Sequence, residues 1–109
     1  MSIDFHKLRV AEVERVTPDA VSIRFELPTD LKSVFAFRAG QHLTLRQEIG
    51  GEEVRRNYSL CVAPFENTLK VAVKEMTGGV FSGWANSALK AGDIVEVMLR
   101  QVMKALMTN

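Results

Sequence analysis

Two short segments carry the groups in this chain that could bind a ligand. Residues 55–60 contain the guanidinium of Arg56, the aromatic ring of Tyr58 and the hydroxyl of Ser59, and residues 78–82 contain a glycine pair followed by a serine. A planar guanidinium can pair with two phosphate oxygens, and glycine backbone can present N–H groups to an anion. An aromatic ring can stack on a planar ligand. Together the segments predict a site for a phosphorylated aromatic cofactor.

A helix is expected directly after the glycine pair. Helical spacing relates Trp84, Ala85, Ala88 and Leu89, and the run Lys90-Ala91-Gly92 ends the pattern. Ser82 is therefore expected to be the N-cap residue of this helix, and the positive end of the helix would favour a phosphate.

The rest of the chain is dominated by short strands with apolar and polar residues in alternation. On the strand that carries the first segment, Arg56 and Tyr58 share one face and Asn57 and Ser59 the other. A glycine pair at 50–51 indicates a hairpin, and a change of phase after Val10 indicates a bulge. The expected strands cover residues 8–16, 21–27, 42–46, 52–61, 69–74 and 95–99.

Six strands, one short helix and no βαβ repeat predict an all-β fold, either a barrel or a sandwich. We favour a closed six-stranded antiparallel Greek-key β-barrel with one short helix, because closure removes exposed strand edges.

Composition narrows the class of protein further. The 109 residues suit one domain, and 14 Lys and Arg against 13 Asp and Glu give a net charge of +1, which offers no reason to expect nucleic acid or membrane partners. Cys61 is the only cysteine and is expected to be an inert core thiol. His6 and His42 have no companions at ligand spacing, so no metal site is predicted. A cytoplasmic location is expected, because no signal peptide and no apolar run of about 20 residues is present.

The two motifs also occur in a recognisable order. Arg56-x-Tyr58-Ser59-Leu60 and Gly79-x-x-Ser82, with Gly40-Gln41 upstream and Val73-Lys74 between them, resemble the FAD-binding barrel of the ferredoxin-NADP reductase superfamily. Within it, the reductase subunits of phenylacetyl-CoA epoxygenase systems, which act in phenylacetate catabolism, show the closer likeness, from about Phe5 to Met98. The phrases that carry it are FRAGQHLTL, GEEVRRNYSL, VAVKEMTGGVFS and GDIVEVM.

The resemblance implies a flavoprotein that binds FAD. Arg56 would contact the FAD pyrophosphate, Tyr58 would pack against the isoalloxazine, and Ser59 would hydrogen-bond near the reactive flavin nitrogen. The backbone of residues 72–74 would meet the flavin or ribityl chain, and residues 80–82 would donate to the pyrophosphate. No catalytic side chain is implied. The full implied set is Arg56, Asn57, Tyr58, Ser59, Ala72, Val73, Lys74, Gly79, Val80, Phe81 and Ser82.

The resemblance also implies parts that these residues do not contain. Relatives continue into an NAD(P)-binding domain, and this subfamily adds an iron-sulfur domain. We therefore expect a truncated reductase barrel over residues 1–99, with a tail over 100–109 that is a short helix or disordered. Such a barrel would exchange electrons through a separate NAD(P)-binding or iron-sulfur protein and would not be an active enzyme alone. Exposed apolar surface suggests a homodimer.

Other interpretations remain open. A lone Arg56 would ordinarily be a solvated strand residue, a lone Tyr58 a core residue, and a lone glycine pair a plain turn. The alternative function is a degenerate barrel that serves as a cofactor-free protein-interaction module. An RNA-binding barrel is disfavoured by the near-neutral charge.

Overall fold

A computed structural model describes residues 5–32, 35, 41–61 and 68–100. The elements follow in the order β1 (His6–Thr17), β2 (Ala20–Phe25), a 3-10 turn (Thr29–Leu31), β3 (His42–Ile49), β4 (Glu52–Ser59), β5 (Leu69–Lys74), α1 (Val80–Ser87) and β6 (Ile94–Arg100). All six predicted strands are present. Beyond Arg100, the tail expected at residues 100–109 lies outside the described residues.

The strands form one antiparallel sheet in the order β4-β3-β6-β1-β2-β5. Its two end strands, β4 and β5, meet where Leu60 bridges Val71 and the Cys61 N–H donates to the Lys70 carbonyl at 2.9 Å. With that bridge, β6 lies beside β3 at the end of the run β3-β4-β5, which is Greek-key order. The six-stranded antiparallel Greek-key barrel with one helix is thus confirmed, although the sheet does not close into a continuous ladder between β4 and β5.

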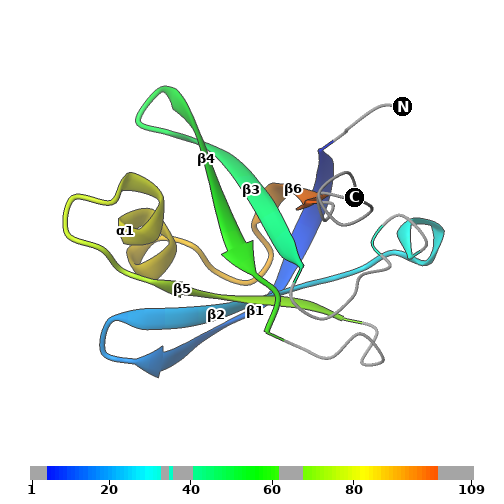
Figure 1. The fold of residues 1–109 in the computed structure, drawn as a ribbon, viewed down its shortest axis with the longest axis horizontal. Coiled ribbons are helices and arrows are strands. Elements are labelled where there is room, and N and C mark those ends of the chain that lie inside the picture. The colour runs from blue at the N-terminus through cyan, green and yellow to red at the C-terminus, as the bar shows by residue number, and fades with distance from the viewer. Residues whose placement is uncertain (1–4, 33–34, 36–40, 62–67, 101–109) are drawn as a thin grey trace, which may run out of the picture.

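The long strand β1 joins the two halves of this sheet. Its first residues pair with β6, from His6 to Arg9, and its later residues pair with β2. The register with β2 shifts between Val10 and Glu12, which confirms the predicted bulge. A bulge bends a strand, so β1 can serve both halves. In Figure 1 the β3-β4 hairpin rises away from β1, β2 and β5, and α1 lies between these groups.

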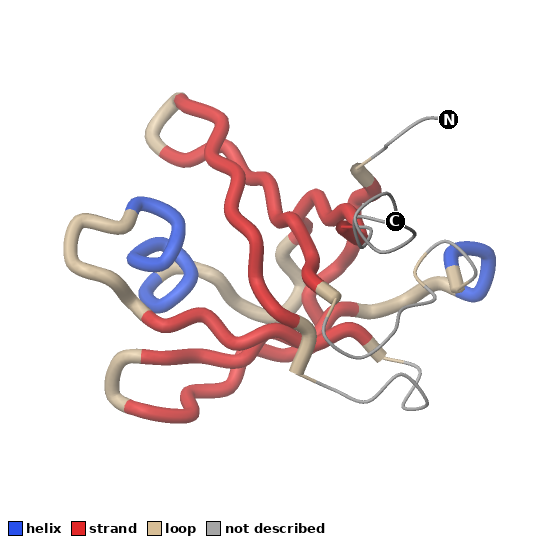
Figure 2. Tube along the Cα trace, viewed as in Figure 1, coloured by secondary structure: helices blue, strands red, loops and turns tan. Residues whose placement is uncertain are grey.

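Alternation along the strands directs one apolar row inward. The buried core draws on every strand and on α1, and its largest side chains are Phe25, Phe35 and Phe81. The predicted hairpin between β3 and β4 is confirmed, with Gly50 and Gly51 at φ 61° and 86°. Two successive residues with positive φ are typical of a type I′ turn, which matches the strand twist. Figure 2 shows that most of the described chain is in strands.

Two local predictions are wrong. The helix α1 begins at Val80 with Gly79 as its N-cap, so Ser82 lies in the first turn and is not the cap. The cause is the preceding turn, which ends when the Gly79 N–H donates to the Met76 carbonyl at 2.8 Å and leaves the next residue ready to start the helix. Cys61 is exposed and does not belong to the core. Leu60 keeps the inward direction of Tyr58, so the alternation points Cys61 outward.

Candidate functional site

The predicted residues gather at the seam where β4 and β5 diverge. The bridge between Leu60 and Val71 is antiparallel. Its register, extended toward the open end, sets Ser59 opposite Ala72 and Tyr58 opposite Val73. Helix α1 contacts both strands and lies at this open end. The fold therefore brings the two motifs together, although some twenty residues separate them in the chain.

Tyr58 supplies an aromatic surface at the seam. Its ring is half-buried, 5.7 Å between centroids from Phe81, and Phe81 lies 5.4 Å from Trp84. Burial raises the pKa of Tyr58 above its usual value, and the nearby guanidinium of Arg56 lowers it in part. The phenol is therefore protonated at neutral pH, so its O–H can donate a hydrogen bond while the ring packs.

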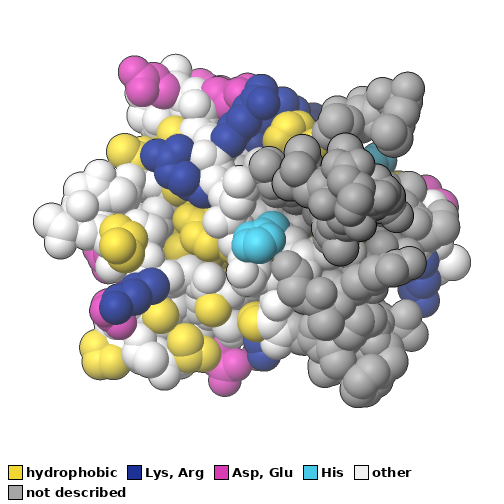
Figure 3. Space-filling view, in the orientation of Figure 1, with side chains coloured by type: hydrophobic (Ala, Val, Ile, Leu, Met, Phe, Trp, Pro, Cys, Tyr) yellow, Lys and Arg dark blue, Asp and Glu magenta, His cyan; other side chains and the backbone are white. Residues whose placement is uncertain are grey.

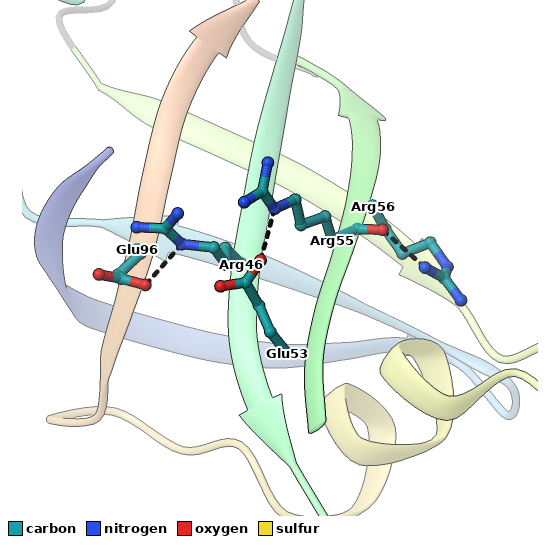
Figure 4. Close-up of polar contacts among 5 residues, drawn as sticks. All are labelled: Arg46, Glu53, Arg55, Arg56 and Glu96. Atoms are coloured by element: carbon teal, nitrogen blue, oxygen red, sulfur yellow. Dashed lines mark hydrogen bonds and ion pairs between the residues drawn. The ribbon is translucent and has the colours of Figure 1, made fainter. Parts of the chain in front are cut away.

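Arg56 is a cation with no acidic partner among the residues that the structure describes. Arg56 is the register partner of Leu45 on β3 and lies on the same face of β4 as Tyr58. Its side chain is exposed to solvent, because β4 is an end strand of the sheet. Its Nη1 donates to the Arg55 carbonyl at 2.6 Å, and it makes no ion pair with any residue that the structure describes. Figure 4 shows Arg56 on the side of β4 nearer α1, with Arg55 on the opposite side. Its guanidinium can accept an anionic ligand.

The start of α1 supplies backbone donors. The first N–H groups of a helix have no intrahelical acceptor. Those of Val80, Phe81 and Ser82 accordingly have no acceptor in the described ranges. The same amides lie at the positive end of the helix, where a phosphate is stabilised.

Glycines shape the approach to these amides. Gly78 has φ 76°, which glycine adopts without strain. A Cβ on Gly79 would collide with the Ser82 Oγ and lie 3.1 Å from the Met76 carbonyl. The Ser82 Oγ accepts the Met76 N–H at 3.0 Å, so this buried hydroxyl holds the turn closed in the present structure. A contact between that hydroxyl and phosphate stays a prediction.

The remaining predicted residues divide between the two faces. Asn57 lies on the outer face of β4, where its Oδ1 accepts from Thr44 Oγ1 at 2.6 Å. Ser59 is on the same outer face, and the side chains of Ala72 and Lys74 are exposed on β5. Val73 points into the core. Only backbone contacts were expected from residues 72–74, and their position at the seam is compatible with that expectation.

Sequence reasoning missed Asn86 and Arg15. The Asn86 Nδ2 donates to the carbonyls of Val73 and Ser82, and Arg15 donates to Asn86. The sequence offered only a weak signal, a polar side chain on a helix of mostly small and apolar residues. The contacts of Asn86 with Val73 and Arg15 join residues 13 and 71 positions apart, so no local spacing predicts them, whereas Ser82 lies only one helical turn before Asn86.

The described residues contain no group of three or more His, Cys, Asp or Glu side chains placed to hold a metal ion. Within the same residues, α1 and the other helical segment are too short and too polar to cross a bilayer.

An aromatic ring, a guanidinium and a row of helix N-terminal amides therefore surround one seam. This donor set suits a ligand with a planar ring at one end and a pyrophosphate at the other. Basic and hydrophobic side chains are also neighbours on the face seen in Figure 3. The residues present fit FAD.

Comparison with known proteins gives an independent result. The family model described as the oxidoreductase FAD-binding domain matches residues 7–99. One of the subunits of 1,2-phenylacetyl-CoA epoxidase from Escherichia coli (strain K12) is 46% identical over 97 residues, which cover 89% of this chain and 27% of that protein. The ferredoxin reductase component of 3-ketosteroid-9-alpha-monooxygenase from Rhodococcus rhodochrous is 39% identical over 94 residues, which cover 84% of this chain and 26% of that protein.

A solved structure agrees in fold. The ferredoxin NADP+ reductase from Neisseria gonorrhoeae with bound FAD and NADP superposes with a TM-score of 0.77 and 20% sequence identity, over 93% of this chain and 40% of that one. The chain thus spans about a quarter of the length of the two curated relatives, at 27% and 26%.

Proposed function

Because this chain belongs to the oxidoreductase FAD-binding domain family, we propose that it is the flavin-binding part of a ferredoxin reductase-like electron-transfer system. FAD is the cofactor of this family. The observation that carries the proposal is the convergence of Arg56, Tyr58 and the first turn of α1 at one seam of the sheet.

Each part of the seam has a task in holding FAD. Arg56 and the amides of residues 80–82 bind the pyrophosphate, and Tyr58 packs against the isoalloxazine. The backbone of Val73 and Lys74 lines the flavin from β5. When bound, FAD supplies the hydride and electron transfer that these side chains cannot perform. The chain's contribution is to bind, orient and partly enclose the ring, with the protonated Tyr58 hydroxyl beside it.

Electron transfer then requires further parts. The two curated relatives are components of larger enzyme systems, and this chain matches about a quarter of each, at 27% and 26%. We propose that an NAD(P)-binding and an iron-sulfur part, in a separate partner or a longer polypeptide, deliver and receive the electrons. These 109 residues would then not oxidise NAD(P)H alone. A homodimer and a cytoplasmic location stay predictions.

A titration with FAD tests the proposal. Trp84 is the chain's one tryptophan and contacts Phe81, which contacts Tyr58, so its fluorescence reports on the seam. We expect saturable quenching of Trp84 together with a change in the flavin absorbance band. If FAD up to about 1 mM gives no saturation while the protein still unfolds cooperatively, the proposal is wrong and a cofactor-free interaction module replaces it.

A further inference from the structure

We infer that Asn86, held by Arg15, is a positioning residue for the phosphate half of the flavin site; this rests on the proposed function. The Asn86 Nδ2 donates to the Val73 carbonyl at 3.1 Å and to the Ser82 carbonyl at 2.9 Å. Val73 lies on the β5 side of the seam, and Ser82 belongs to the helical turn with the unpaired amides. One carboxamide therefore ties both walls of the site together.

Arg15 fixes the orientation of that carboxamide. Its Nη1 donates to Asn86 Oδ1 at 2.9 Å, and its Nη2 donates to the Asn86 carbonyl at 2.6 Å. The same Nη1 reaches the Pro18 carbonyl at 3.3 Å, so the end of the β1-β2 hairpin is linked to the last turn of α1. A guanidinium can only donate, which requires the amide oxygen of Asn86 to face Arg15 and the amide nitrogen to face the two carbonyls.

Apolar packing alone does not fix the position of α1 against the sheet. Phe81, Ala85 and Leu89 bury one face of the helical segment and thereby set which side of α1 meets the sheet. Apolar contacts are non-directional and tolerate small slides along the helix axis, whereas hydrogen bonds have narrow distance limits. The Asn86 bonds therefore fix the axial position of α1, and with it the position of the amides of residues 80–82 relative to Tyr58 and Val73.

Asparagine is also the side chain that this place requires. An aspartate of the same shape would keep the contact with Arg15 but would turn a carboxylate oxygen toward the carbonyls of Val73 and Ser82, with no donor for either. Asn86→Asp therefore separates the tie across the seam from the contact with Arg15. Ser87→Ala is the matched control, because Ser87 is exposed on the same helix and its Oγ donates only to Gly83 within the helix, at 2.7 Å.

The test compares flavins with and without phosphate. Dissociation constants for FAD, FMN and riboflavin are measured by Trp84 fluorescence, at a temperature where each variant is folded. We expect Asn86→Ala and Asn86→Asp to weaken FAD and FMN binding about tenfold, and riboflavin binding less than about twofold, because riboflavin has no phosphate to lose. Ser87→Ala should leave all three constants within about twofold of wild type. A merely structural residue would weaken all three flavins alike.

Three outcomes overturn the inference. If wild type binds and both Asn86 variants keep the wild-type ratio of riboflavin to FMN dissociation constants, the inference fails while the proposed function stands. If the Asn86 variants do not fold, the test uses Arg15→Ala, which changes an exposed side chain. A loss of affinity of about threefold for FMN, with riboflavin affinity unchanged, supports the inference. An unchanged ratio of riboflavin to FMN dissociation constants overturns it. If wild type binds no flavin, both proposals fall.

Discussion

Two neighbouring arginines on β4 differ in how their charge is satisfied. On the outer face, the Arg55 Nε donates to Glu53 Oε2 at 2.7 Å, and the Arg46 Nε donates to Glu96 Oε1 at the same 2.7 Å. The Phe5 ring lies 3.9 Å from the Arg46 guanidinium carbon. On the seam face, Arg56 (Figure 4) has no carboxylate partner among the described residues. The amides at the start of α1 have no acceptor among these residues either.

The difference shows which polar groups serve the fold and which remain available to a ligand. A net charge of +1 hides this, because Arg46 and Arg55 on the outer face are paired with carboxylates while Arg56 and a row of helix donors at the seam carry charge of the same sign. Their fields add at a single place. Variants on each face test whether ligand binding and stability are divided between the two faces.

The largest expected effect comes from removing one arginine at a time. Arg56→Ala should raise the dissociation constant for FAD about 30- to 150-fold, because a charge-assisted hydrogen bond contributes about 2–3 kcal/mol. Arg55→Ala, one residue away, should change it less than about threefold. Isothermal titration calorimetry at fixed ionic strength measures both. Equal losses in the two variants would contradict the division between the faces.

A smaller effect is expected from adding one methyl group to a glycine at the seam. Gly79→Ala puts a Cβ against the Ser82 Oγ and disturbs the turn that closes on Met76. Overpacking costs about 1–3 kcal/mol, so FAD binding should weaken about tenfold. Gly83→Ala is the control, because nothing lies within 4 Å of its added Cβ, and it should bind FAD as wild type does. Tight FAD binding by Gly79→Ala would show that the turn adapts freely.

The smallest effect is expected on the outer face and concerns stability alone. The hydrogen bond from Arg46 lowers the pKa of Glu96 below its usual value. A carboxyl whose pKa is lower in the folded than in the unfolded state stabilises the fold above its unfolded-state pKa, near 4, and loses that contribution as the pH falls through the folded-state pKa. Glu96→Gln should therefore lower the free energy of unfolding by about 0.5 kcal/mol at pH 7, with FAD affinity unchanged.

Urea denaturation at pH 7 and at about pH 3 measures that difference. The gap between wild type and Glu96→Gln should be smaller at the lower pH, because protonation of Glu96 makes both side chains neutral. A gap that is independent of pH would mean that the variant acts through packing and not through the ion pair.

The strands could be predicted from sequence because apolar and polar residues alternate along each strand according to which face is buried. The β3-β4 hairpin and the β1 bulge were equally local, since a glycine pair and a change of phase mark them. The N-cap was not predicted correctly, because the choice between Gly79 and Ser82 depends on where the turn after Met76 ends. The Arg15-Asn86 contact lay beyond prediction, because it joins residues 71 positions apart.

The incomplete closure between β4 and β5 has a consequence for motion. Within the described residues, β4 and β5 are joined only by a bridge at one end. From that bridge toward Arg56 on β4 and Glu75, which directly follows β5, no ladder of hydrogen bonds between the two strands protects the backbone groups. Amides along such a margin exchange with solvent through small local openings that leave the core intact. A flat ligand bound between β4 and β5 would make those local openings less frequent. Slow deuterium uptake along β4 and β5 in the presence of FAD would then report occupancy without any redox chemistry.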